Sequence, residues 1–196
     1  MAGLSAIVMA SGFSKRFGQK NKLLMPLGQM TIIERTVQSL IDAQVNQILV
    51  VTQYKEVAAI FSNNPSVEVV MNASAVEGIS ASIRLGVAAS QENHGFMFVP
   101  GDQALLQSQT LKSLTSGYMA SPDKIIIPIY KGTPGSPKIF PPSLRKQLME
   151  LTGDHGGRAI LQHNQSLIKK QHFQQTLDNL DIDTYDRYQR IREDFQ

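Results

Sequence analysis

The sequence predicts an α/β fold in which a mostly parallel β-sheet is covered by helices on both faces. Short, continuous apolar segments rich in β-branched residues alternate along the chain with longer amphipathic segments. Strands that are apolar throughout are typical of parallel sheets, because both faces of such a sheet are buried. No linker, internal repeat or low-complexity tract interrupts this pattern, so we expect one domain over residues 1–196.

The first half of the chain is predicted to contain three strands, each followed by a helix. Thr31 and Glu34 have the separation of a capping box, so one helix is expected to begin there. Its apolar face is formed by positions 33, 37, 40 and 41. The other elements expected in this half are strands at residues 5–9, 47–52 and 67–71 and helices at residues 55–61 and 79–90.

The second half begins with the same alternation and then becomes irregular. A strand at residues 96–99, a helix at 107–120 and a strand at 124–130 continue the pattern. Residues 131–142 contain two glycines and four prolines, which predicts a shaped loop with at most a short strand at 138–140. The remaining expected elements are a helix at 143–151, a turn at 152–157, a strand at 166–171 and a charged surface helix at 185–195.

The composition excludes several classes of function. The net charge is only +3 and no basic run is present, so we expect neither a nucleic-acid nor a membrane partner. The absence of cysteine excludes disulfides, thiolate catalysis and cysteine-ligated metals. The four histidines, at positions 94, 155, 163 and 172, lack metal-ligand spacing and are expected at the surface. Without a secretion signal or an apolar stretch of membrane-spanning length, a cytoplasmic location is expected.

A glycine-containing loop with two cations follows the first expected strand. The apolar run at residues 6–9 leads into Ser11, Gly12 and Ser14, and the charges of Arg16 and Lys22 follow. Small residues allow backbone N–H groups to approach an anion closely, and the two cations add full positive charge. The segment lacks both the Gly-Lys-Ser/Thr ending of a P-loop and the G-x-G-x-x-G spacing of dinucleotide-binding loops. It is either a different kind of phosphate loop or a solvated surface turn.

Aspartates follow two other expected strands. Asp102 comes after the apolar run 96–99 on a Pro-Gly turn, and Asp183 lies beyond the last expected strand. In open α/β sheets, ligands bind outside the carboxyl ends of the strands, and Mg²⁺ is commonly held by one or two carboxylates plus substrate phosphates. These residues therefore form a candidate Mg²⁺ site. The alternatives are a turn or helix cap for Asp102 and a helix cap for Asp183.

Two further polar segments are candidates for ligand binding. Asn72 follows the third expected strand and is a candidate contact for a base or a ribose. Ser82 lies near the start of a helix, whose N-terminus favours an anion. Residues 153–158, which include Asp154, form a candidate second ligand loop. An ordinary loop, helix start and connecting turn are the alternative interpretations.

The chemistry that fits these residues is nucleotidyl transfer. A phosphomonoester has its second pKa at about 6, so a phosphate nucleophile is ionised without a protein base. An enzyme for this reaction mainly needs in-line positioning and neutralisation of developing negative charge by Mg²⁺, Arg and Lys. The sequence offers those groups and no evident Ser-His-Asp or Cys-His constellation.

The motifs taken together resemble the MobA-like NTP transferases, and within them the molybdenum cofactor cytidylyltransferases. The family pattern Ala-Gly-x-Ser-x-Arg-Met-Gly followed by Lys is similar to residues 11–18 and Lys22. Its Asn…Gly-x-x-x-Ser-x-Arg/Lys segment is similar to Asn72 with residues 78–84, and its Gly-Asp to residues 101–102. Its late Gly-Asp-x-Gly and Asp-Ile-Asp-Thr patterns are similar to residues 153–156 and 181–188.

This resemblance implies a Rossmann-like, three-layer αβα fold of the nucleotide-diphospho-sugar transferase type, with a mostly parallel mixed sheet. It implies that CMP is transferred from CTP to the phosphate of molybdopterin with release of pyrophosphate, and that a molybdenum hydroxylase is a possible recipient of the product. The implied nucleotide-binding residues are Ala10, Ser11, Gly12, Ser14, Arg16, Lys22, Asn72 and Ser82. The implied catalytic residues are Arg16, Lys22 and Asp102; Asp102 and Asp183 are implied to hold Mg²⁺, and Ser136 and Asp154 to contact the pterin substrate.

Departures from the family pattern leave alternatives open. Residues 9–12 lack the second glycine typical of guanylyltransferases, which favours CTP, but the hydroxyl of Ser11 leaves GTP as an alternative. An apparent insertion after Gly18 makes Lys20 a competitor of Lys22. Ser136 stands where the family often has histidine, so another phosphorylated acceptor, such as a sugar or polyol phosphate, is also open. A cofactor-binding maturation factor without turnover is the alternative outside enzymes.

Overall fold

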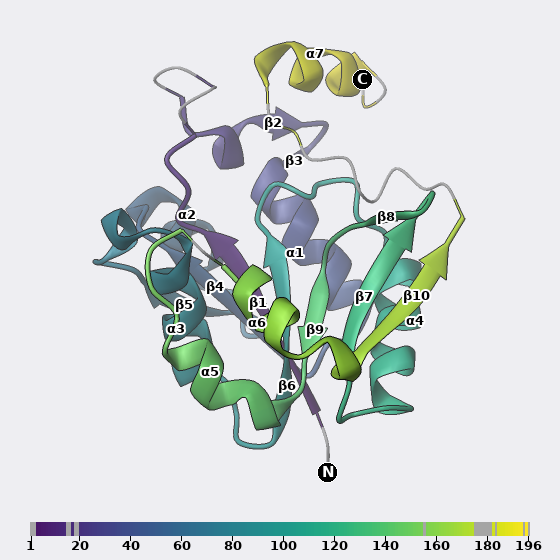
Figure 1. The fold of residues 1–196 in the computed structure, drawn as a ribbon. Helices are drawn as coiled ribbons and strands as arrows, with labels where there is room; N and C mark the ends of the chain where they lie inside the picture. Colours follow the sequence, from purple (N-terminus) through teal and green to yellow (C-terminus); the bar gives the residue numbers. More distant parts are fainter. Residues whose placement is uncertain are drawn as a thin grey trace.

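A mixed β-sheet forms the centre of the computed structural model. The structure describes residues 3–14, 17, 20–154, 156–174, 182, 184–193 and 195. The strand order is β10-β7-β9-β6-β1-β4-β5, and β8 pairs with β7 (Figure 1). Pairing is parallel throughout this order except at β9, and β8 is also antiparallel to its partner. The predicted mostly parallel mixed sheet is therefore confirmed. Its strands are β1 (Gly3–Ala10), β4 (Gln47–Thr52), β5 (Glu68–Met71), β6 (His94–Pro100), β7 (Ile125–Tyr130), β8 (Thr133–Pro134), β9 (Lys138–Phe140) and β10 (Ile168–Phe173).

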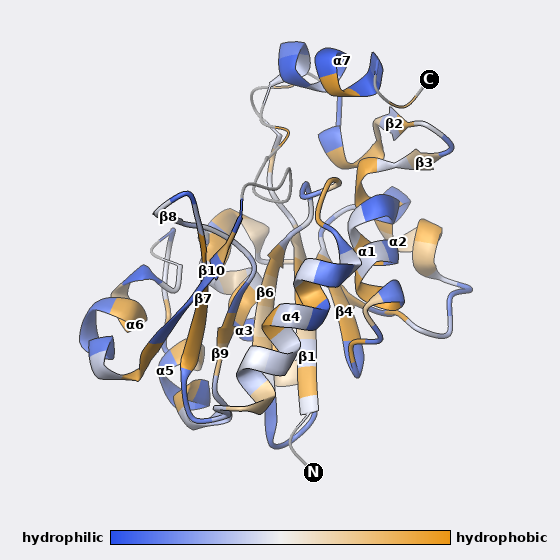
Figure 2. Cartoon of the chain, turned by 90° about the vertical axis from the view of Figure 1, so that its right-hand side faces the viewer, coloured by the Kyte–Doolittle hydropathy of each residue, from blue (hydrophilic) through white to orange (hydrophobic). Residues whose placement is uncertain are grey.

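Helices cover both faces of this sheet, which gives the three-layer arrangement visible in Figures 1 and 2. One apolar cluster packs α1 (Ile32–Asp42), α2 (Lys55–Phe61) and α4 (Ser108–Met119) against one face. The other cluster packs α3 (Ile79–Ala89), α5 (Arg145–Met149) and α6 (Arg158–His163) against the opposite face. Successive side chains of a strand point to opposite faces, so Ala6 and Val8 join the first cluster and Ile7 joins the second.

Several elements have the bounds that the sequence predicts. The predicted bounds of β4, α2 and β9 coincide with the observed ones. The Thr31–Glu34 capping box at the start of α1 is also confirmed, since the Thr31 N–H donates to Glu34 Oε2 over 2.7 Å. The hairpin of β2 (Pro26–Leu27) and β3 (Met30–Thr31) and the six-residue helix α6 were not predicted. Segments this short contain too few residues to display a periodicity.

The antiparallel strand β9 inserts between β6 and β7 and reverses the chain direction locally. Phe98 pairs with Lys138, and Phe96 pairs with Phe140. Residues 131–137 precede β9, so this register brings them to the edge of the sheet where the parallel strands end. The predicted helix at 143–151 is instead a 3₁₀ turn, Pro142–Leu144, followed by the shorter α5.

The last helix, α7 (Tyr185–Glu193), lies above the carboxyl edge of the sheet, next to the β2–β3 hairpin (Figure 1). Most of its side chains are exposed, as predicted, but Tyr188 is buried. The Tyr188 hydroxyl donates to the carbonyl of Pro26 over 2.6 Å, and its ring centroid lies 6.4 Å from that of Phe17. The helix is thereby packed against the loop that follows β1. No helix in the described part of the chain is long and apolar enough to cross a membrane.

The prediction that all four histidines lie at the surface is wrong for His94. Its side chain is buried at the amino end of β6, and its Nδ1 lies 3.0 Å from Ser5 Oγ. The Ser5 hydroxyl donates to Gln47 Oε1 over 2.7 Å, so His94 is the donor in its own hydrogen bond with Ser5. Burial lowers the pKa of His94 from its ordinary value of 6.5. His163 and His172 are exposed, and His155 lies outside the described residues.

Candidate nucleotide-binding site

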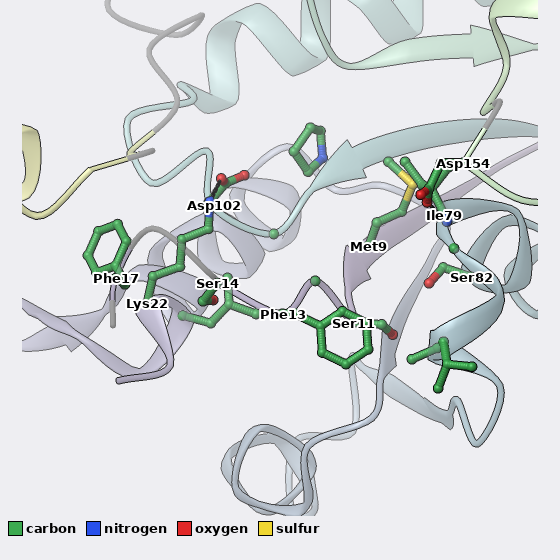
Figure 3. Close-up of a pocket in the computed structure, with 17 residues that line it drawn as sticks. Met9, Ser11, Phe13, Ser14, Phe17, Lys22, Ile79, Ser82, Asp102 and Asp154 are labelled. Carbon is green, nitrogen blue, oxygen red and sulfur yellow. Dashed lines mark hydrogen bonds and ion pairs between the residues drawn. The ribbon is translucent and has the colours of Figure 1, made fainter. Parts of the chain in front are cut away.

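A pocket of about 630 Å³ opens at the carboxyl edge of the sheet, where the parallel strands β1, β5 and β6 end. This is the edge at which open α/β sheets bind ligands. Figure 3 shows a charged end, with Lys22 and Asp102 near Ser14 and Phe17, and a second end with Met9, Ile79, Ser82 and Asp154. The lining residues are Met9, Ser11, Gly12, Phe13, Ser14, Phe17, Lys22, Leu23, Ala75, Val76, Gly78, Ile79, Ser82, Pro100, Gly101, Asp102 and Asp154.

The loop after β1 is oriented by three consecutive residues at the end of β4. The Thr52 hydroxyl donates to the carbonyl of residue 10 over 3.0 Å. Gln53 Nε2 donates to the carbonyl of residue 11 over 2.7 Å, and the Tyr54 hydroxyl to that of residue 12 over 2.8 Å. In a trans peptide the N–H points away from the C=O, so the N–H groups of residues 11–13 are directed away from these donors. Residues 11–13 also line the pocket. The local structure is thus suited to surround an anion with N–H groups.

Ser14 continues this loop in a conformation that few residues adopt. Its φ is 49°, in the left-handed region, and its hydroxyl oxygen is buried without a hydrogen-bond partner among the described residues. A buried polar atom that lacks a partner costs free energy, so an unpaired hydroxyl lining a pocket is suited to a polar ligand. This observation supports the phosphate-loop interpretation over a solvated surface turn.

Lys22 and Asp102 form an ion pair at the charged end of the pocket. Both side chains are largely buried, with exposed fractions of 18% for Lys22 and 13% for Asp102. Lys22 begins a 3₁₀ turn, Lys22–Leu24, in which Asn21 Oδ1 accepts from the Leu23 N–H over 3.1 Å. Lys20 is exposed and does not line the pocket, so the fold brings Lys22 to Asp102.

The turn that carries Asp102 is held against β1 and α1. The Gly101 N–H donates to the Met9 carbonyl over 3.2 Å, and the Gly101 carbonyl accepts from Thr36 Oγ1 over 3.1 Å. A Cβ at position 101 would lie 3.1 Å from the Met9 carbonyl oxygen, so glycine allows this close approach. The next helix has Gln107 as its N-cap, so Asp102 does not serve as a helix cap. Its carboxylate is therefore placed at the pocket by the turn itself.

Asn72 lies beneath the pocket rather than on its wall. The side chain is 2% exposed, and its Nδ2 donates to Ser11 Oγ over 3.2 Å and to Ser82 Oγ over 3.1 Å. Its Oδ1 accepts from the Ser74 N–H over 3.0 Å. Asn72 thus joins the loop after β1, the segment after β5 and the first turn of α3. Ser11 and Ser82, but not Asn72, line the pocket.

Asp154 occupies the N-terminus of α3. Its Oδ1 accepts from the Ile79 N–H over 3.2 Å, and the neighbouring Gly153 carbonyl accepts from the Ser80 N–H over 3.2 Å. Gly78 makes this contact possible, because its φ is 93° and a Cβ there would lie 2.4 Å from the carboxylate. The helix end that was predicted to favour an anion is therefore satisfied by a carboxylate of the chain itself.

The other predicted site residues are distributed as follows. Ala10 is buried at the end of β1 behind the loop. Ser136 is half-buried, its carbonyl accepts from the Tyr130 hydroxyl over 3.4 Å, and it does not line this pocket. Arg16 and Asp183 lie outside the described residues. Asp102 alone supplies the described part of the predicted Mg²⁺ site, and the described residues contain no group of three or more metal-binding side chains.

Several apolar lining residues were not assigned a role from the sequence. Phe13, Val76 and Ile79 line the pocket although they are 50%, 83% and 38% exposed. Large apolar side chains at this level of exposure are suited to contact a flat, apolar ligand surface. The sequence signal for such a residue is a large apolar side chain in a loop between two elements, as at Val76. Whether that side chain is exposed in a pocket depends on the fold.

The comparison with known families assigns the chain to a class of enzymes. The MobA-like NTP transferase domain family matches residues 6–171 of the chain. The chain therefore belongs to this family and is a nucleotidyltransferase enzyme.

Individual relatives are similar over almost their entire length. The molybdenum cofactor cytidylyltransferase of Escherichia coli (strain K12) is 25% identical over 199 residues, which cover 98% of this chain and 97% of that protein. A nucleotidyl transferase from Methanothermobacter thermautotroptrophicus is 24% identical with a TM-score of 0.82, covering 98% and 97% of the two chains. Rv0371c of Mycobacterium tuberculosis H37Rv in complex with manganese is 21% identical with a TM-score of 0.79, covering 98% and 99%. At these identities the two solved structures support the fold.

Proposed function

We propose that the protein transfers CMP from CTP to the terminal phosphate of molybdopterin or molybdenum cofactor, with release of pyrophosphate. The observation that carries this proposal is the charged end of the pocket, where the Lys22–Asp102 ion pair lies beside the phosphate loop. The choice of acceptor and nucleotide is supported by the similarity to the cytidylyltransferase of Escherichia coli.

The charged end of the pocket is suited to the triphosphate. Ser14 offers a hydroxyl that has no hydrogen-bond partner in the described part of the chain, and the backbone of residues 11–13 offers N–H groups. On nucleotide binding, Lys22 exchanges the Asp102 carboxylate for phosphate oxygens, and Asp102 becomes available to a divalent cation. We assign Arg16 to the same phosphates, following the family pattern of the loop.

A carboxylate is the ligand that Mg²⁺ prefers, and one or two carboxylates plus substrate phosphates complete many of its sites. Asp102 fits this role, because its carboxylate lines the charged end of the pocket, and we assign Asp183 as the second carboxylate. Bound Mg²⁺ supplies neutralisation of the charge that develops on the leaving pyrophosphate. The manganese in the Mycobacterium tuberculosis relative supports a divalent metal at such a fold.

The reaction requires positioning more than acid–base chemistry. An acceptor phosphate oxygen, already ionised at neutral pH, attacks the α-phosphorus of the nucleotide. The bond from the α-phosphorus to the bridging oxygen breaks, and pyrophosphate leaves with the electron pair. Lys22 and the loop N–H groups hold the triphosphate in line and oppose the developing negative charge.

The second end of the pocket is suited to a heterocycle. Ile79 presents apolar surface there, next to the polar groups of Ser82 and Asp154 (Figure 3), and the exposed side chains of Phe13 and Val76 line the same pocket. The hydroxyl of Ser11 donates its single hydrogen to the Val51 carbonyl over 3.1 Å, so that hydrogen is not available to the base. The chain thus retains the loop character that favours CTP over GTP. For the pterin substrate we assign Asp154 and Ser136.

The direct test is pyrophosphate release with molybdenum cofactor, Mg²⁺ and each ribonucleoside triphosphate in turn. We expect release with CTP, loss of release on chelation of the metal, and its recovery with added Mg²⁺. Release with GTP instead would assign the guanylyl reaction. Absence of release with all four nucleotides, while the cofactor still binds, would favour another phosphorylated acceptor or a cofactor carrier.

A further inference from the structure

Both side-chain N–H groups of Asn72 are used inside the protein. An amide nitrogen has two hydrogens and no acceptor site, so Nδ2 must be the donor to both Ser11 Oγ and Ser82 Oγ. The amide oxygen accepts from the Ser74 N–H, which fixes the orientation of the amide group. The three side chains are buried, with exposed fractions of 7% for Ser11, 2% for Asn72 and 4% for Ser82. The directions of the bonds in this network are therefore determined.

Ser11 and Ser82 differ in whether their hydroxyl hydrogen remains available to a ligand. The single hydrogen of the Ser11 hydroxyl is donated to the Val51 carbonyl, so this hydroxyl has no donor left. The Ser82 hydroxyl accepts from Asn72, and no described residue accepts its hydrogen. Ser82 lines the pocket in the same helical turn as Ile79, and Phe13 and Val76 line the same pocket. Its free hydrogen is thus available next to the apolar surface assigned to the heterocycle.

We propose that Asn72 is a positioning residue that makes the Ser82 hydroxyl a hydrogen-bond donor to a carbonyl oxygen of the nucleobase. Because the Asn72 N–H occupies an acceptor site of Ser82 Oγ, the hydroxyl hydrogen is directed to the pocket. A ring carbonyl of a pyrimidine accepts such a hydrogen, whereas an exocyclic amino group does not. The interpretation of Asn72 as a direct contact to base or ribose is thereby replaced by an indirect role. This inference rests on the nucleotidyl transfer proposed above.

The substitution Asn72→Asp tests the direction of these bonds with almost no change in shape. The carboxylate keeps an oxygen for the Ser74 N–H but has no hydrogen to donate, so the Ser82 hydroxyl turns to donate to it. The donor facing the base is then lost. We expect the Kd and the KM for CTP to rise about five- to twentyfold, as for loss of one neutral hydrogen bond, with kcat within about twofold.

Three comparisons separate this role from general support of the fold. Ser82→Ala is expected to raise the KM for CTP as much as Asn72→Asp does, and the double variant no more than either one. Inorganic tripolyphosphate, which has phosphates but no ring carbonyl, is expected to bind both variants as it binds the wild type. Ser90→Ala removes another buried hydroxyl at the opposite end of α3, which donates to the Gly86 carbonyl over 2.7 Å. This control is expected to leave the KM unchanged.

The outcomes are distinct for the two proposals. If the wild-type protein turns over CTP but Ser82→Ala and Asn72→Asp bind it within twofold of the wild type, the inference is overturned and the proposed function stands. Equal losses of affinity for CTP and tripolyphosphate, or multiplicative effects in the double variant, also overturn it. If Asn72→Asp does not fold, the affinities of Ser82→Ala for CTP and for tripolyphosphate are sufficient to test the inference. If the wild type turns over no nucleotide, the proposed function itself fails.

Discussion

The two ends of β1 carry buried polar clusters that differ in whether they are closed. At the amino end, Ser5 bonds to both Gln47 and His94, and Gln47 also accepts from the Gln91 N–H over 3.0 Å. At the carboxyl end, the Ser82 hydroxyl and the Ser14 hydroxyl retain capacity for a ligand, and the Lys22–Asp102 pair borders the same pocket.

This difference shows how one set of strands supports both stability and function. Buried polar groups are normally satisfied within the protein, so a closed cluster holds its strands together. Groups left partly unsatisfied beside a pocket are instead completed by the ligand, at some expense of stability. We therefore expect substitutions at the carboxyl end to change activity and substitutions at the amino end to change stability.

The largest effect on activity is expected for Asp102→Asn. The amide keeps the shape of the side chain but removes the charge that holds a divalent cation, so kcat should fall about 10²–10³-fold. The free energy of unfolding should fall modestly, because the Lys22–Asp102 pair is largely buried and the amide no longer balances the Lys22 charge. Steady-state pyrophosphate release and urea unfolding measure the two quantities. Activity within tenfold of the wild type would contradict the assigned role of Asp102.

Lys22→Met and Lys20→Met form a matched pair for the same end of the pocket. Lys22 borders the pocket and Lys20 is exposed outside it, although both precede the first helix by similar distances in sequence. We expect Lys22→Met to lower kcat/KM for CTP about 10²-fold, as for loss of one preorganised charge, and Lys20→Met to leave it nearly unchanged. Similar losses for both variants would mean that the loop rearranges on nucleotide binding.

At the closed end, Ser5→Ala is expected to lower stability without affecting catalysis. The variant leaves His94 Nδ1 and Gln47 Oε1 with one hydrogen bond fewer in a buried setting, which costs about 1–3 kcal/mol. Urea unfolding followed by circular dichroism measures the change, and kcat for pyrophosphate release is the control. A loss of kcat without a loss of stability would contradict the comparison between the two ends.

The smallest expected effect is the contribution of His94 to the pH dependence of folding stability. Burial lowers the pKa of His94 below its unfolded value, so the folded state favours the neutral imidazole. The resulting stability is complete above the unfolded pKa of about 6.5 and is lost as the pH falls through the range below it. We expect Tm to decline on acidification from about pH 7 to about pH 5.5, and less so in His94→Gln. An equal decline in both proteins would exclude His94 as the cause.

Parts of the site follow from local sequence. The loop Ser11–Ser14, Lys22 and Asp102 were predicted as a group, because they follow strands that the apolar pattern identifies and the ends of parallel strands meet at one edge. The loop residue Phe17 replaces the methionine of the family pattern. Its contact with Tyr185 and Tyr188 of α7 joins segments about 170 residues apart, which no local pattern could have predicted.

The sequence by itself determined the alternation of strands and helices, the edge of the sheet where ligands bind and the kind of chemistry expected there. Apolar periodicity, a capping box and loops after strands are local features, so they can be recognised without the fold. Only the tertiary structure decided that Asn72 bonds to Ser11 and Ser82, that Asp154 caps α3 and that Lys22 rather than Lys20 meets Asp102. These contacts join residues 10 to 80 positions apart, and their partners are selected by how the layers pack around the sheet.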